Sequence, residues 1–160
     1  MNTGINNMQK ETKTVFYKNS FVIHTHTKII DYEWLYRQHK RIFDECDYMF
    51  QRHNVKVCLA VFKMTDNDNS ISSVAFKNML RLTDKYIPSD TEEYHIVLFT
   101  FCNIKMAYQA ISRIEKTLIM QLKAFNHIKG FKCAVMQRKA SNSLFGILKE
   151  CCHLVETNQS

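Results

Sequence analysis

Several side chains of this sequence could do chemistry, and an arginine and an aspartate are the most informative. Arg81 and Asp84 are separated by two residues. Arginine can grip a phosphate or the Hoogsteen edge of guanine with two parallel hydrogen bonds, and aspartate can accept hydrogen bonds from a guanine N–H edge. The same spacing also occurs in surface ion pairs, which contribute well under about 1 kcal/mol. The pair therefore indicates either an anion site or a structural contact.

Other reactive residue types are present, but their spacing does not favour catalysis. Acidic clusters at 44–47 and 92–93 lie in polar surroundings, whereas acid–base catalysis needs desolvated carboxylates that face each other. Cys152 adjoins His153, yet neighbours on a helix point about 100° apart and cannot act as nucleophile and base. A histidine pair at 24 and 26 has no evident third metal ligand. We therefore predict no catalytic residue and no metal site.

Composition excludes further classes of site. The 160 residues include three glycines and one proline, whereas usage of about 7% would supply about eleven glycines. Loops that cradle phosphate with bare backbone N–H groups need glycine, so no such loop is expected. The net charge of +7 favours either solubility or a bound anion. There is no RNP motif, zinc-finger spacing or basic arm, so general nucleic-acid binding is not expected.

The cysteines and the apolar runs indicate a cytoplasmic protein. Six cysteines occur without a C-x-x-C pair, and no signal peptide is recognisable. The longest apolar run, near 57–62, is far too short to span a membrane. We therefore expect reduced cysteines and no membrane span.

The elements that must position these residues form one globular domain. Residues 1–13 are interpreted as a flexible leader, 14–54 as an N-terminal arm and helix, and 55–156 as the main domain. Within the arm, 15–30 could form an extra strand or an extended segment. A single long helix is predicted over 31–53, with an aspartate as its N-cap.

The main domain alternates between strands and helices. Strands are predicted at 55–64, 94–101 and 131–136, with a turn or hairpin at 85–93. Helices are expected to follow the first strand, to begin after Asn103, and to begin after Ser141 or Asn142. The first of these helices should bury a stripe made of Ile71, Val74, Ala75, Met79 and Leu82. This order predicts an α/β fold, an α+β sandwich whose small mixed sheet carries helices packed over it, on a ferredoxin-like or palm-like plan.

The segment 81–119 resembles part of the GGDEF domains, which synthesise cyclic di-GMP. In that family an R-x-x-D motif precedes the signature by five residues, and here five residues separate Asp84 from a pentad at the signature position. That pentad is Asp90, Thr91, Glu92, Glu93 and Tyr94. An apolar strand and a helix with the pattern A-x-x-A-x-x-R-I follow. The resemblance covers roughly 55–155 and implies the GGDEF variant of the palm-like plan.

Departures from the family imply that catalysis has been lost. Asp90 and Thr91 replace the two signature glycines, so side chains lie where substrate must approach the backbone. The family's metal-binding aspartate aligns with Lys63, and an ammonium cannot ligate Mg²⁺. Glu92 remains at the other metal position, where one carboxylate holds Mg²⁺ poorly. The segment 65–70 leaves no room for the guanine-recognising residues of the family.

The remaining R-x-x-D motif forms, in the family, an inhibitory site for the dinucleotide product. The resemblance therefore implies a bacterial, catalytically inactive regulatory module without a cofactor. This module would bind cyclic di-GMP through Arg81 and Asp84, assisted by Lys85 or Arg113, and would signal to a protein partner. The alternative is a ligand-free interaction or scaffold domain with the same fold, which could dimerise. Aromatic and Met-rich residues of the first helix favour this alternative: Trp34, Tyr36, Tyr48, Met49 and Phe50.

Overall fold

The computed structural model describes residues 13–16, 30–64, 72–91, 93–124 and 131–157. In chain order its elements are β1 (Lys13–Phe16), α2 (Tyr32–Gln38), α3 (Lys40–His53), β2 (Val57–Met64), α4 (Ser73–Lys77), β3 (Lys85–Ile87), β4 (Tyr94–Thr100), α5 (Ile104–Ala124), β5 (Phe131–Gln137) and α6 (Leu144–Thr157). The predicted leader, apart from its last residue, and the histidine pair at 24 and 26 lie outside the described residues.

The strands form one five-stranded sheet in the order β1-β5-β2-β4-β3. From β2 to β5 the chain follows a β-α-β-β-α-β path, so the ferredoxin-like plan is confirmed. The expectation of mixed strand directions is wrong, because every paired strand runs antiparallel to its neighbour. Each helical crossover joins two parallel strands, but a third strand lies between them: β4 separates β2 from β3, and β2 separates β4 from β5.

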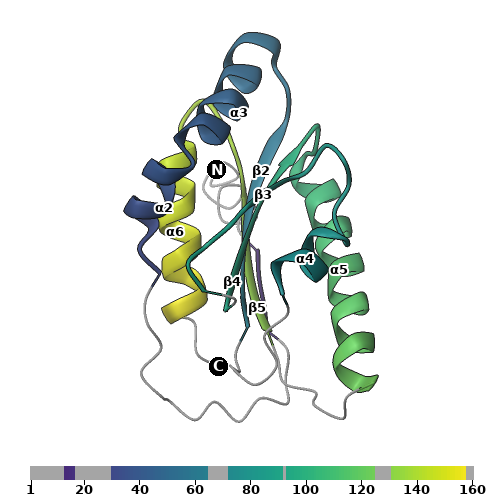
Figure 1. Ribbon diagram of the computed structural model, residues 1–160. Coiled ribbons are helices and arrows are strands. Elements are labelled where there is room, and N and C mark those ends of the chain that lie inside the picture. The colour runs from purple at the N-terminus through teal and green to yellow at the C-terminus, as the bar shows by residue number, and fades with distance from the viewer. Residues whose placement is uncertain (1–12, 17–29, 65–71, 92, 125–130, 158–160) are drawn as a thin grey trace, which may run out of the picture.

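Helices cover both faces of the sheet, which gives three layers (Figure 1). The central strand β2 is buried along its whole length, and its side chains alternate between two apolar clusters. Leu59 and Val61 pack with α2, α3 and α6, whereas Ala60 and Phe62 pack with α4 and α5. The predicted sandwich is therefore confirmed, with a core on each side of the sheet.

The N-terminal helix is divided, contrary to the single helix predicted over 31–53. Asp31 does cap it, since its Oδ1 accepts from the Trp34 backbone N–H at 3.0 Å. His39 then leaves helical geometry (φ −114°, ψ 24°), and its Nε2 lies 3.0 Å from the Pro88 carbonyl oxygen. The helices on either side of the break both bury apolar residues against the same core. A contact across 49 residues accompanies the break, and helical periodicity does not report such contacts.

The helix after β2 is shorter than predicted, and its apolar stripe is only partly as predicted. Ala75 and Met79 pack against the core, whereas Ile71 lies outside the described residues. In α4 the buried side chain is Phe76, whose ring stacks on His95 at 4.4 Å between centroids, whereas Val74 is 69% exposed. Leu82 lies beyond the helix, in a turn, and is fully exposed. The aromatic stack therefore sets the orientation of the helix.

Candidate functional site

Arg81 and Asp84 lie in a turn immediately before β3 and not on a helix. We call residues 81–84 the Arg81 turn. The Asp84 backbone N–H donates to the Arg81 carbonyl at 3.0 Å, and the Arg81 backbone N–H donates to Asp84 Oδ2 at 2.8 Å. Backbone and side chain therefore close the turn together.

The two side chains also bind each other. Arg81 Nη2 donates to Asp84 Oδ1 at 3.0 Å, and Nε donates to Oδ2 at 3.4 Å, so both carboxylate oxygens are used. The Asp84 side chain is 0% exposed and that of Arg81 is 35% exposed. The hydrogen bonds from the guanidinium to Asp84 raise the pKa of Arg81. The aspartate thus acts as a buried counter-charge that orients a partly exposed guanidinium.

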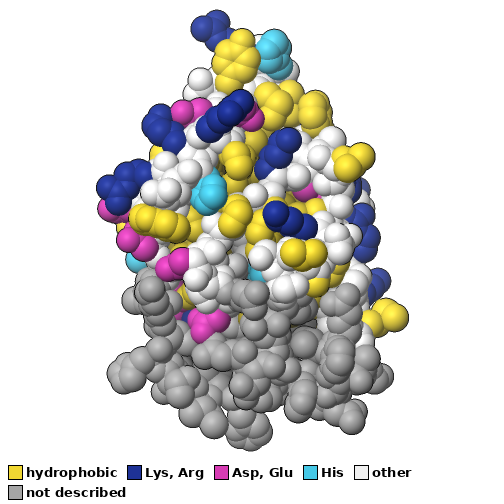
Figure 2. Space-filling model, in the orientation of Figure 1, with side chains coloured by type: hydrophobic (Ala, Val, Ile, Leu, Met, Phe, Trp, Pro, Cys, Tyr) yellow, Lys and Arg dark blue, Asp and Glu magenta, His cyan; other side chains and the backbone are white. Residues whose placement is uncertain are grey.

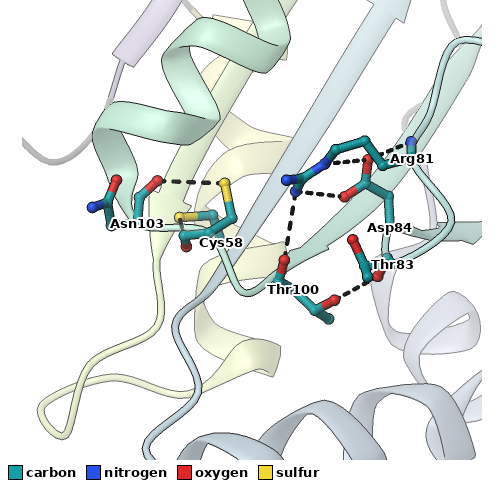
Figure 3. Close-up of polar contacts among 7 residues, drawn as sticks. Cys58, Arg81, Thr83, Asp84, Thr100 and Asn103 are labelled. Atoms are coloured by element: carbon teal, nitrogen blue, oxygen red, sulfur yellow. Dashed lines mark hydrogen bonds and ion pairs between the residues drawn. The ribbon is translucent and has the colours of Figure 1, made fainter.

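The Arg81 turn is anchored to the end of β4. Arg81 Nη2 lies 3.5 Å from the Thr100 carbonyl oxygen, and the Thr100 hydroxyl donates to the Thr83 carbonyl (Figure 3). The next residue, Phe101, has a left-handed backbone (φ 54°), which is uncommon for a bulky residue. Its side chain is 58% exposed. An exposed aromatic side chain therefore follows directly after the carbonyl group that Arg81 contacts.

Three exposed apolar residues lie close in sequence to the Arg81 turn or to its anchor at Thr100. We call Leu82, Phe101 and Met106 the apolar rim; Leu82 is fully exposed and Met106 is 41% exposed. Figure 2 shows hydrophobic side chains next to Lys and Arg side chains on the face it presents. Such a surface suits an anion with an apolar or aromatic body.

The two basic residues expected to assist are not brought to Arg81. Lys85 lies on β3 and lines a separate groove of about 820 Å³. Arg113 is exposed on α5, nine residues after Ile104, so it lies about 13 Å further along the helix axis. Among the described contacts, neither residue bonds to Arg81 or Asp84, and their role in binding stays a prediction.

The groove at Lys85 also contains Asp44 and Glu45 of the first acidic cluster, whereas Asp47 binds Arg138 Nε at 2.9 Å. Apart from Lys85, the groove is lined by the α3 residues Lys40, Arg41, Asp44, Glu45, Tyr48 and Met49. Lys40 Nζ binds Asp44 Oδ2 at 2.9 Å, and Arg41 Nε binds Glu45 Oε1 at 3.3 Å. These carboxylates are partners of lysine and arginine one helical turn away on an exposed face.

The pentad at the signature position forms the connection between β3 and β4. Asp90 is exposed, Thr91 Oγ1 accepts from the Glu93 backbone N–H at 3.2 Å, and the Glu93 carbonyl accepts from the Met64 backbone N–H at 2.7 Å. Tyr94 is fully buried in β4, and Glu92 lies outside the described residues.

Lys63, aligned with the family's metal ligand, has a structural partner. Its Nζ lies 2.8 Å from Glu156 Oε2 and 5.6 Å from the centre of the Tyr94 ring, and both charged side chains are mostly buried. The described residues include no group of three or more His, Cys, Asp or Glu side chains placed to hold a metal ion.

Sequence reasoning missed a pair of thiols beside the Arg81 turn. Cys58 Sγ–H donates to the Cys102 carbonyl at 3.3 Å, and Cys102 Sγ lies 3.5 Å from the Asn103 carbonyl (Figure 3). A hydrogen bond from Cys58 and the charge of Arg81 lower the pKa of Cys102, although burial opposes the shift. The two cysteines are 44 residues apart, so only the β2–β4 pairing reveals the contact.

Comparisons with known proteins give no family assignment. No protein-family model matches the chain, and neither a curated protein nor a solved structure matches it. Within the described ranges, no helix has both the length and the apolar character that crossing a bilayer requires.

Proposed function

We propose that this chain is a non-catalytic regulatory module that binds cyclic di-GMP at the Arg81 turn and signals to a protein partner. One observation supports this most: a guanidinium, fixed by Asp84 and about one third exposed, contacts the Thr100 carbonyl, and the next residue, Phe101, is exposed. A guanidinium grips phosphate, and an aromatic face stacks on a base. A guanine dinucleotide offers both groups.

In this proposal Asp84 holds Arg81 in place and does not bind guanine. Both of its oxygens already accept hydrogen bonds from Arg81, and the side chain has no contact with solvent. Binding guanine through Asp84 would require the ion pair to open. We therefore assign the ligand contacts to Arg81 and Phe101, and Asp84 becomes a positioning residue.

The first test is isothermal titration of cyclic di-GMP into the wild type and three variants. The wild type should bind at micromolar concentration or tighter. Arg81→Lys keeps the charge but cannot form a bidentate hydrogen bond with phosphate, so binding should weaken. Phe101→Ala should weaken binding by about 1–3 kcal/mol, the usual contribution of one stacked base. Arg37→Ala is the matched control, because that arginine is exposed on α2 and is not part of the proposed site, so the affinity of this variant should be unchanged.

The receptor proposal is contradicted if the folded wild type gives no heat of binding with cyclic di-GMP. It must also show no rise in melting temperature at high ligand concentration. If Arg37→Ala weakened binding while Arg81→Lys did not, the ligand would bind elsewhere. Melting curves of each variant separate loss of binding from loss of fold.

A second candidate function is an interaction domain that needs no ligand. Tyr48 on α3 is 57% exposed and lines the groove beside Lys85, and Trp34 on α2 is also exposed. Met49 lines the same groove and also packs partly against the core, whereas Tyr36 and Phe50 pack partly against the core.

Homodimerisation through this surface is the form that can be tested directly. Analytical ultracentrifugation at increasing protein concentration should show a dimer. The Tyr48→Glu variant should stay monomeric over the same range. Sedimentation as a monomer throughout the range would remove this version of the interaction hypothesis.

A further inference from the structure

The two thiols beside the Arg81 turn are held together by backbone pairing. Cys58 lies in β2 opposite Phe99 of β4, and the Cys102 backbone N–H donates to the Lys56 carbonyl at 3.0 Å. One end of the contact therefore lies in β2, and the other is held by Lys56, the residue that precedes β2. The hydrogen bond from Cys58 Sγ to the Cys102 carbonyl then brings the first thiol against the residue that carries the second.

The pKa of Cys102 shifts in the opposite direction to that of Cys58, which its hydrogen bond with Cys102 and burial both raise. Arg81 is hydrogen-bonded to the Thr100 carbonyl, two residues before Cys102, and its positive charge favours a Cys102 thiolate. Burial instead raises the pKa of Cys46 to about 11 and that of Cys152 to about 12. Cys151 is also shifted upward by burial. Low pKa and a neighbouring thiol are what a reversible redox site needs.

We infer that Cys58 and Cys102 form a redox-active dithiol that responds to hydroperoxides. Cys102, next to Arg81, is the thiol that reacts first, and Cys58 is the thiol that resolves the product. This assignment does not depend on nucleotide binding.

The proposed reaction has two balanced steps. The Cys102 thiolate attacks one oxygen of the hydroperoxide, the O–O bond breaks, and a sulfenic acid forms while the other oxygen leaves as water or an alcohol after taking up a proton. The Cys58 thiol then attacks the Cys102 sulfur and gives up its proton, an S–S bond forms, and the hydroxide that leaves takes up that proton to become water. Two thiols are oxidised to one disulfide, and one hydroperoxide is reduced.

Burial limits which oxidants reach this pair. Cys58 and Cys102 are at most 1% exposed. A bulky alkylating reagent should therefore react more slowly than a small peroxide. A cross-link would also fix the segment that carries Phe101, so oxidation would affect the same surface as a ligand.

The experiment treats the folded wild-type chain with hydrogen peroxide, blocks free thiols, and maps disulfides by peptide mass spectrometry. The expected product is a Cys58–Cys102 disulfide that appears before Cys151 or Cys152 is modified. In the Cys58→Ser variant, oxidation should stop at a Cys102 sulfenic acid, which dimedone traps. In the Cys102→Ser variant, Cys58 should stay reduced. Arg81→Gln should slow the first step by about three- to tenfold, the range that a pKa change of about one unit gives.

The wild-type map alone can overturn the proposal, so it does not depend on variants that fold. If Cys58 and Cys102 stay reduced while Cys151 or Cys152 oxidises in a chain that remains folded, the dithiol is not a redox site. Equally, oxidation of Cys58 in the Cys102→Ser variant would contradict the assigned order. Neither result would bear on cyclic di-GMP binding, which the titration measures separately.

Discussion

At the scale of single residues, the Asp84 side chain binds Arg81 and is buried, although its motif was expected to bind a ligand. Its carboxylate accepts hydrogen bonds from the backbone and the side chain of Arg81 and is shielded from water. The spacing of Arg81 and Asp84 indicated this contact as one of two interpretations. The sequence could not indicate that Thr100 and Cys102 complete the surroundings, because these residues come close only through strand pairing.

Asp84→Asn should therefore lower the free energy of unfolding by about 1–3 kcal/mol, because a buried acceptor loses its charge beside a partly buried arginine. Asp44→Asn is the matched control: its pair with Lys40 is exposed on both sides and should contribute less than about 0.5 kcal/mol. Urea unfolding of the two variants measures the difference. Equal effects would mean that burial of Asp84 does not strengthen its ion pair.

At the scale of elements, long apolar segments were predicted well and short ones were not. β2, β4 and α5 follow from continuous or periodic apolar runs, and the predicted cap of α5 is confirmed, since Asn103 Oδ1 accepts from the Met106 backbone N–H at 2.9 Å. The break at His39 and the short α4 depend on contacts with Pro88 and His95, which are distant in sequence. Tertiary contacts of this kind override local propensity.

The N-cap of α6 in the structure differs from the cap predicted from the sequence, and the two assignments can be tested. The sequence suggested Ser141 or Asn142 as the cap, but Ser143 Oγ accepts from the Gly146 backbone N–H at 3.0 Å. Asn142 instead binds the Lys139 N–H and the Gln137 carbonyl in the preceding turn. Ser143→Ala should cost about 1 kcal/mol of stability, and Ser141→Ala should cost almost nothing. Thermal melts of the two alanine variants decide between them, and a larger loss for Ser141→Ala would contradict the structure.

At the scale of the whole molecule, buried thiols link stability to alkaline pH. Desolvation raises the pKa of Cys46 to about 11 and that of Cys152 to about 12, above the ordinary value of 9.0. A group whose pKa is raised by folding stabilises the protein below its unfolded pKa, and that contribution is lost as pH rises through the folded value. Lys132 acts in the opposite direction, because burial lowers its pKa.

We expect the melting temperature to fall between about pH 9 and pH 11, since the unfolded chain loses thiol protons that the folded chain retains. Cys46→Ala should flatten this decline, whatever its effect on stability at neutral pH. Melting curves measured from pH 8 to pH 11 test both statements. A melting temperature that stayed level or rose over this range would show that the buried thiols do not dominate the alkaline response.

The register of the central strand has a consequence for how the chain is made. Cys58 of β2 is paired with Gln137 of β5, 79 residues later. At about 5–20 residues per second, synthesis of that interval takes about 4–16 s. During this time β2, the most apolar strand, lacks one of its two neighbours and can pair with another chain. The nascent protein should therefore need a chaperone or a low local concentration until β5 emerges from the ribosome.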